Sequence, residues 1–268
     1  NFLSWTYHIL PFFDQGPLFK KVDSNIYFGT GNNAVLCTTI LTTMRCPSDA
    51  GPPQANGGVQ RMGVSNYLGN YGTGMPDPNV HPQSVQGIFG ANTRTAIRDV
   101  RDGMSNVFLV AERRNPSVCG SWSVEGGPAN VADALGGCSL WAAAAGNSGD
   151  NFIFEPGPQQ TPTATAAGNV AFYQILGTTR SGVTGGQRLA GNLAANTAWA
   201  AGTAGTIKIN RTLYNQSAVA GDFTNATTVG FGSSHTGGMQ AVLGDGTVRF
   251  LSENIDSTIY ENLSRKSD

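Results

Sequence analysis

The chain has 268 residues, only 12% of them charged, and a formal net charge of −1. This balance excludes the basic surface that binding to nucleic acid or to anionic lipid requires. The length is sufficient for a single domain with a hydrophobic core over 1–268, and no apolar run reaches the roughly 18 residues of a membrane-spanning helix.

Two short helices are predicted at the beginning of the chain. Aromatic and aliphatic residues recur at helical spacing over 3–10, and Pro11 should end or kink that helix. A second helix is expected over 16–22. From 25 to 90, short apolar runs alternate with turns that contain glycine and proline, and the stretch SNYLGNYG predicts a strand.

The stretch VFLVAE, at 107–112, predicts a buried strand, and Asp102 and Gly103 form the pivot of the polar turn before it. Asp99 and Asp102 carry oxygen atoms of the kind that calcium prefers. However, their spacing matches no calcium-binding loop, and neighbouring arginines offset their charge. We therefore expect no bound cofactor, with calcium at Asp99 and Asp102 as the alternative.

The segment 120–230 is rich in Gly, Ala, Thr and Asn, which predicts a loop-rich insert. The stretches VAFYQIL and GTIKINRTLY are expected to form strands within it. Trp122, Trp141 and Trp199 also lie here, and a disordered segment would hold fewer aromatic residues. Exposed in one groove, these tryptophans could stack on a sugar.

The C-terminal part predicts a β-hairpin followed by a helix. The strands MQAVL and TVRFL flank Gly244, Asp245 and Gly246, and these glycines allow the positive φ values of a tight turn. In the helix after the hairpin, Thr258 and Glu261 have capping-box spacing. The expected fold class is α+β and mostly antiparallel β, with short N-terminal helices and long loops rich in Gly, Asn and Thr.

The four cysteines form two sequence-local pairs, Cys37 with Cys46 and Cys119 with Cys138. Neither pair has the C-x-x-C spacing of zinc or thioredoxin-type sites. Two local disulfides in an oxidising compartment are the favoured interpretation, and four buried thiols are the alternative. Together with the Gly, Asn and Thr content, the disulfides predict an extracellular or cell-surface protein.

His235 is the main catalytic candidate, because the sequence contains no nucleophile elbow, Walker loop, dinucleotide-binding turn or zinc-protease motif. Ser233 or Ser234 stands beside it, and Asp245 or Asp222 could orient it. An extended strand rises about 3.3 Å per residue and would place His235 about 20–30 Å from Asp245. We therefore expect no catalytic activity, and a hydrolase is the least favoured hypothesis.

Four blocks of the chain resemble, in the same order, those of a large planctomycete-type family with a prepilin-like N-terminus and otherwise undescribed function. The blocks are SWTYHILPFFDQGPLF, MRCPSDA, IRDVRDGMSNVFLVAE and FGSSHTGGMQAVLGDGTVRFLSENID. The residues at the signature positions are Cys46, Pro47, Ser48, Asp49, Asp102, Gly103, Ser105, Asn106, Glu112, His235, Asp245 and Gly246.

The resemblance implies a pilin-like globular head, related to type IV pilins and type II secretion pseudopilins. Such proteins are exported, have a cleaved leader and a long hydrophobic N-terminal helix, and self-associate into a polymer. Neither the leader nor this helix lies within the 268 residues, so we expect membrane attachment only through a helix outside this chain. The expected function is a structural subunit of an extracellular filament, pseudopilus or surface assembly. The alternative is a secreted module that binds a solute or polysaccharide.

Overall fold

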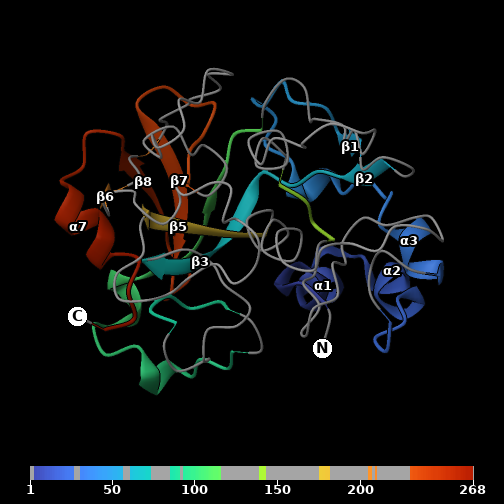
Figure 1. Ribbon diagram of the computed structural model, residues 1–268, viewed down its shortest axis with the longest axis horizontal. Coiled ribbons are helices and arrows are strands. Elements are labelled where there is room, and N and C mark those ends of the chain that lie inside the picture. Colours follow the sequence, from blue (N-terminus) through green and yellow to red (C-terminus); the bar gives the residue numbers. More distant parts are fainter. Residues whose placement is uncertain are drawn as a thin grey trace, which may run out of the picture.

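The computed structural model describes residues 3–26, 31–56, 61–73, 85–90, 93–115, 139–142, 175–181, 205–206, 209 and 230–267. Within these ranges the fold is α+β, with a mostly antiparallel sheet and short helices, as expected (Figure 1). The helices that these ranges contain are all too short or too polar to cross a membrane.

Short helices form the N-terminal part. The two predicted helices are α1 (Trp5–Ile9) and α2 (Gly16–Lys21). The 3-10 turn η1 (Leu10–Phe13) and α3 (Gly31–Leu36) were not predicted, and α3 lies in the region expected to alternate apolar runs with turns. Pro11 occupies the first turn of η1, where its missing N–H is no loss. The proline therefore marks the change from α1 to the 3-10 turn. In Figure 1 these helices lie at the opposite end of the molecule from α7 (Ser257–Asn262).

A six-stranded sheet with the order β6-β5-β3-β4-β7-β8 forms the centre of the fold. Its strands in chain order are β3 (Tyr67–Thr73), β4 (Phe108–Glu112), β5 (Leu176–Ser181), β6 (Gly205–Thr206), β7 (Gly238–Leu243) and β8 (Val248–Ser252). β3 and β5 are parallel, whereas the other neighbours are antiparallel. A separate pair consists of β1 (Gln54–Asn56) and β2 (Arg61–Gly63). The described residues also contain the 3-10 turns η2 (Thr42–Met44), η4 (Ile97–Asp99) and η5 (Met104–Asn106).

The predicted C-terminal hairpin is confirmed. β7 and β8 pair in continuous register from Gly238 opposite Ser252 to Val242 opposite Val248. Gly246 in the turn has a φ of 86°, which favours glycine. The predicted cap of the C-terminal helix, a capping box of Thr258 and Glu261, is wrong. The N-cap is Asp256, whose side chain accepts hydrogen bonds from the N–H groups of Thr258 and Ile259.

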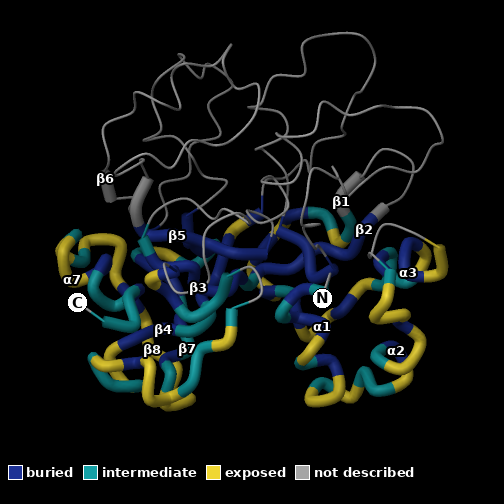
Figure 2. The backbone as a smooth tube through the Cα atoms, turned by 60° about the horizontal axis from the view of Figure 1, so that its bottom comes forward, coloured by how far each residue is buried: buried dark blue, intermediate teal, exposed yellow. Residues whose placement is uncertain are grey.

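Two clusters of buried hydrophobic residues pack on the sheet and on the N-terminal helices. The first contains Tyr7, Leu10, Tyr71 and Trp141, and joins the N-terminal helices to β3. The second consists of Leu68, Phe108, Ala111, Ile209, Phe231, Met239, Ala241, Leu243, Leu251 and Tyr260, and lies under α7. In Figure 2 the buried residues run through the middle of the molecule along β3 and β5.

Part of the predicted insert lies within the described residues. β5 and β6 confirm that strands are embedded in 120–230, although β5 begins at the last residue of VAFYQIL. Trp141 is fully buried in the first core cluster and donates its indole N–H to the backbone oxygen of Thr39. This tryptophan therefore has a packing role and cannot stack on a sugar, whereas Trp122 and Trp199 lie outside the described residues.

Candidate functional site

Three side chains from distant parts of the chain meet beside the central sheet. Cys46 lies just after η2, Glu112 is the last residue of β4, and His235 lies in the loop before β7. The imidazole Nε2 of His235 lies 3.6 Å from the Sγ of Cys46 and 3.5 Å from the Oε1 of Glu112. All three ligand atoms lie within 4.8 Å of one another. We call these three residues the Cys–Glu–His cluster.

Each member of the cluster is held by a backbone hydrogen bond. The N–H of Gln240 donates to the Oε2 of Glu112 at 2.8 Å, so one carboxylate oxygen is fixed and the other faces His235. The N–H of Cys46 donates to the Oδ1 of Asn66 at 3.0 Å. The N–H of His235 donates to the Oγ of Ser233 at 3.2 Å. β4 and β7 are adjacent and antiparallel, so the end of β4 and the start of β7 meet here.

A buried carboxylate stabilises the loops that carry the cluster. Pro47 and Ser48 form the centre of a turn in which the N–H of Asp49 donates to the backbone oxygen of Cys46. The Oδ2 of Asp49 then accepts hydrogen bonds from the side-chain amide of Asn66 and from the backbone N–H and side-chain amide of Asn115.

The same carboxylate reaches the loop of His235. The Oδ1 of Asp49 accepts hydrogen bonds from the N–H of Gly51 and the Oγ of Ser234, the neighbour of His235. Asn66 also donates to the backbone oxygen of Arg113, the residue after Glu112. The Asp49 network thus connects all three segments of the Cys–Glu–His cluster, and it fixes their relative positions.

The cluster combines burial with access from solvent. The side chain of Glu112 is 6% exposed, whereas that of His235 is 40% exposed. Cys46 is also buried. Burial and, next, the proximity of Glu112 and Cys46 raise the pKa of the neighbouring Tyr67 phenol. The site is therefore lined by sulfur, nitrogen and oxygen atoms, and it opens toward solvent on the imidazole side.

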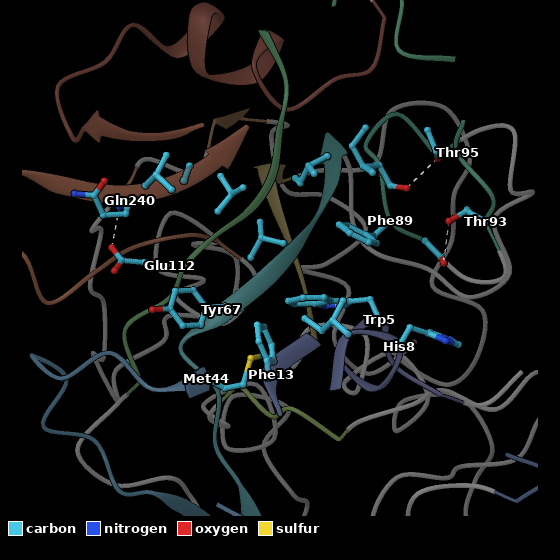
Figure 3. Close-up of a pocket in the computed structure, with 18 of the residues that line it drawn as sticks. Trp5, His8, Phe13, Met44, Tyr67, Phe89, Thr93, Thr95, Glu112 and Gln240 are labelled. Carbon is cyan, nitrogen blue, oxygen red and sulfur yellow. Dashed lines mark hydrogen bonds between the residues drawn. The ribbon is translucent and has the colours of Figure 1, made fainter. Parts of the chain in front are cut away.

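A groove with a volume of about 1160 Å³ begins at Glu112 and extends along one face of the sheet. Figure 3 shows Glu112 and Gln240 at one end of this groove, with Tyr67 between them and Phe13. Aliphatic side chains of β4, β7 and β8 and aromatic side chains of the N-terminal region line it. The main apolar ones are Leu3, Trp5, Ile9, Phe13, Met44, Ile88, Phe89, Leu109, Val110, Val242 and Val248.

A family model described as a protein of unknown function, DUF1559 (SBP_bac_10), matches residues 1–258. The chain belongs to the DUF1559 family. No curated protein and no solved structure matches this sequence. The description of the DUF1559 family names no activity.

The residues that the sequence predicts as signature positions fall at two places in the fold. Six of them, Cys46, Pro47, Ser48, Asp49, Glu112 and His235, are at the cluster and its network. The others lie at the tip of the β7–β8 hairpin, where the N–H of Gly244 donates to the oxygen of Val107. These others are Asp102, Gly103, Ser105, Asn106, Asp245 and Gly246.

The hairpin tip is a structural junction. The N–H of Asp245 donates to the oxygen of Met104, and the side-chain amide of Asn106 donates to the oxygen of Asp102. β7 separates Asp245 from His235, and a six-residue strand spans about 20 Å. The two residues therefore share no site, as the predicted hairpin implied.

In the described part of the chain, the calcium candidates near this junction form no group of three with another His, Cys, Asp or Glu side chain. The Oδ2 of Asp99 accepts the N–H of Ala96 at 2.8 Å and closes a local turn. Within the described ranges, the Cys–Glu–His cluster is the group of three such side chains that lie close enough together to hold a metal ion. Calcium at Asp99 and Asp102 stays a prediction.

The expected disulfide between Cys37 and Cys46 is wrong in this structure, where both residues are thiols. The physical reason is that their side chains enter different environments. Cys37 is fully buried in the first hydrophobic cluster, and this burial raises the pKa of its thiol. Cys46 instead faces His235. Cys119 and Cys138 lie outside the described residues.

Sequence reasoning missed the convergence of the cluster and the polar residues that hold it. Asn66, Asn115 and Gln240 had no distinguishing motif, since Asn is common throughout the chain. The one available signal was position, because Asn66 immediately precedes β3 and Asn115 lies just after β4. Polar residues at the ends of adjacent strands can meet at one edge of a sheet.

Proposed function

We propose that this DUF1559 protein is a structural subunit of an extracellular filament, pseudopilus or surface assembly. The resemblance to pilin-like proteins motivates the proposal, and the apolar groove is the observation that carries it. Soluble monomers rarely leave a large contiguous apolar surface open to water, and such surfaces mark interaction sites.

The sheet offers one face for assembly. In β7, Met239, Ala241 and Leu243 pack into the second core cluster, so the alternate residues Gln240 and Val242 point to the opposite face and line the groove. β8 continues that face at the edge of the sheet, and its Val248 is 63% exposed. Figure 2 shows β8 at the margin of the molecule with its residues mostly exposed.

The shape of the groove suits an apolar helix. The sheet supplies a floor of aliphatic side chains, and the N-terminal region supplies an aromatic wall with Trp5 and Phe13. A helix that lays one apolar face into such a groove is a common mode of association. The long hydrophobic helix of pilin-type assembly has this chemistry, so we propose it as the occupant.

The experiment compares two valines of nearly equal exposure in the full-length native protein. Val248→Asp places a charge on the groove, whereas Val35→Asp places the same charge on α3, where Val35 is 62% exposed and outside the groove lining. We expect negative-stain images of native material to show ordered polymers for the wild type and for V35D, and none for V248D. Monodisperse wild-type monomers at high concentration, or normal polymers of V248D, would refute the proposal.

A solute- or polysaccharide-binding module is the second candidate. It is favoured by the aromatic side chains of Trp5, Tyr67 and Phe89 along one groove, together with the polar end at Glu112 and Gln240. In that case calorimetric titration with oligosaccharides should give saturable binding that Trp5→Ala abolishes, and V248D should leave the oligomeric state unchanged. The two candidates therefore differ in what V248D does to self-association.

A further inference from the structure

We propose that Cys46, Glu112 and His235 form a binding site for a zinc-type divalent metal ion. This inference is independent of the proposed assembly function. It starts from the donor set, which consists of one thiol sulfur, one imidazole nitrogen and one carboxylate oxygen. Zinc is bound by these three kinds of ligand, whereas calcium and magnesium select oxygen ligands alone.

Two of the three distances between the donor atoms match those of ligands around one tetrahedral ion, and the third is no more than 4.8 Å. With Zn–S of about 2.3 Å and Zn–N and Zn–O of about 2.05 Å, tetrahedral angles place S and N about 3.5 Å apart and N and O about 3.3 Å apart. The observed separations are 3.6 Å from Cys46 Sγ to His235 Nε2, and 3.5 Å from that nitrogen to Glu112 Oε1. The donor atoms are therefore close enough together to share one ion.

The contact between Cys46 and His235 is within hydrogen-bonding distance for sulfur, but the separation of His235 and Glu112 argues against a direct hydrogen bond between those two side chains. An N–H donor and a carboxylate oxygen normally approach to 2.7–3.2 Å. The 3.5 Å between His235 Nε2 and Glu112 Oε1 lies beyond that range. The carboxylate and the imidazole thus face each other at a separation typical of two ligands that share an ion.

A catalytic Cys–His–acid relay is also disfavoured by the geometry. In such a relay the two ring nitrogens of the histidine have different partners, with the nucleophile at one and the orienting acid at the other. Here the single nitrogen Nε2 of His235 faces both Cys46 and Glu112. One nitrogen that lies close to both a sulfur and a carboxylate oxygen suits an ion shared by all three.

The surroundings hold the donors in place before an ion arrives. Gln240 fixes the second oxygen of Glu112, and Asn66 fixes the backbone of Cys46. Such partners orient the ligands of metal sites, and their loss typically lowers the affinity by about 10–100-fold. The half-exposed imidazole of His235 leaves a path from solvent. Three protein ligands also leave a fourth position for water or for an external group.

Because the three ligands come from three segments, a bound ion would stabilise the folded chain. A ligand that binds only the folded state stabilises that state. The gain in stability grows with the logarithm of the ligand concentration relative to the dissociation constant. The thermal midpoint should therefore rise with Zn²⁺ and should not respond to Ca²⁺ or Mg²⁺. This readout requires no knowledge of the biological activity.

The experiment uses the purified chain, stripped with a chelator and titrated with Co²⁺ and then with Zn²⁺. We expect one ion per chain, with a thiolate-to-cobalt charge-transfer absorption in the near ultraviolet that Zn²⁺ abolishes by displacement. Cys46→Ser should remove this absorption, and Glu112→Gln and His235→Gln should each weaken binding by at least about 10–100-fold. The matched controls are Cys37→Ser and His8→Gln, because Cys37 packs in the core and His8 is exposed on α1.

The outcomes separate a metal site from a chance arrangement of side chains. Loss of binding in the three cluster variants, with retention in C37S and H8Q, supports the proposal. Absence of saturable one-to-one binding in the wild type would overturn it, and so would equal binding by H235Q. His235 is partly exposed, so H235Q should fold even if C46S does not. Circular dichroism of each variant checks that point.

Discussion

Cys46 Sγ lies 3.6 Å from His235 Nε2, although 189 positions separate the two residues in the chain. The contact forms because β4 and β7 are neighbours in the sheet and because the Asp49 network brings the loop after η2 to the same edge. Cys46 is therefore part of a polar cluster and is not paired with Cys37.

The first prediction concerns the state of these thiols. Mass spectrometry of protein that is alkylated under denaturing conditions without reductant should find Cys37 and Cys46 both modified, because the structure holds both as thiols. The control is the same digest after reduction, which should give the same two modified peptides. A peptide cross-linked between Cys37 and Cys46 in the unreduced sample would contradict this expectation.

The second prediction concerns Asp49, whose buried carboxylate accepts hydrogen bonds from four residues. Asp49→Ala should lower the free energy of unfolding by about 2–4 kcal/mol, because each buried donor left unsatisfied costs about 1–3 kcal/mol. Asp23→Ala is the control, since Asp23 is exposed and, among the described residues, its side chain bonds its neighbour Asn25, and it should cost at most about 0.5 kcal/mol. Urea denaturation measures both, and equal losses would disprove the role of the network.

The third prediction tests the cap of α7. Asp256→Ala should destabilise the protein by about 1 kcal/mol, because its side chain satisfies the N–H groups of Thr258 and Ile259. Thr258→Ala should change the stability by less than about 0.5 kcal/mol. Chemical denaturation of the two variants distinguishes them. A larger effect of Thr258→Ala would restore the capping box predicted from the sequence.

The fourth prediction concerns Gly63 in β2. A methyl group at this position would overlap the backbone oxygen of Thr39 and the indole of Trp141. Gly63→Ala should therefore lower the stability by about 1–3 kcal/mol through overpacking. Gly16→Ala is the matched control, because nothing lies within 4 Å of its added carbon, and it should be neutral or stabilising by about 0.4–1 kcal/mol. Thermal melting of both variants is the measurement.

The fifth prediction concerns the hairpin turn, where hydrogen bonds from the Oγ1 and then the N–H of Thr247 lower the pKa of Asp245. A carboxylate with a lowered pKa stabilises the fold above its unfolded pKa, and this contribution is lost as the pH falls through the folded pKa. Thr247→Val should raise the pKa of Asp245 in an NMR titration. Thr247→Ser keeps the hydroxyl and should leave the pKa low, so an equal rise in both variants would point to another cause.

Much of the local structure could be predicted from the sequence. The helix break at Pro11, the strands at 67–73 and 108–112, and the β7–β8 hairpin result from residue spacing, fixed proline geometry and glycine turn chemistry. These features depend on residues that are close in the chain. The separation of His235 from Asp245 was predictable for the same reason, since one strand joins them.

Only the tertiary structure determined which residues come together at the site. Cys46, Glu112 and His235 are neighbours only because β3, β4 and β7 lie side by side, an order that no local pattern specifies. Sequence proximity favoured a Cys37–Cys46 disulfide, but packing placed Cys37 in the apolar core and Cys46 at the polar edge. The sequence by itself therefore determined the elements and the likeness to a family. Long-range pairing of strands, which responds to the burial of side chains from the whole chain, determined which of its polar residues meet.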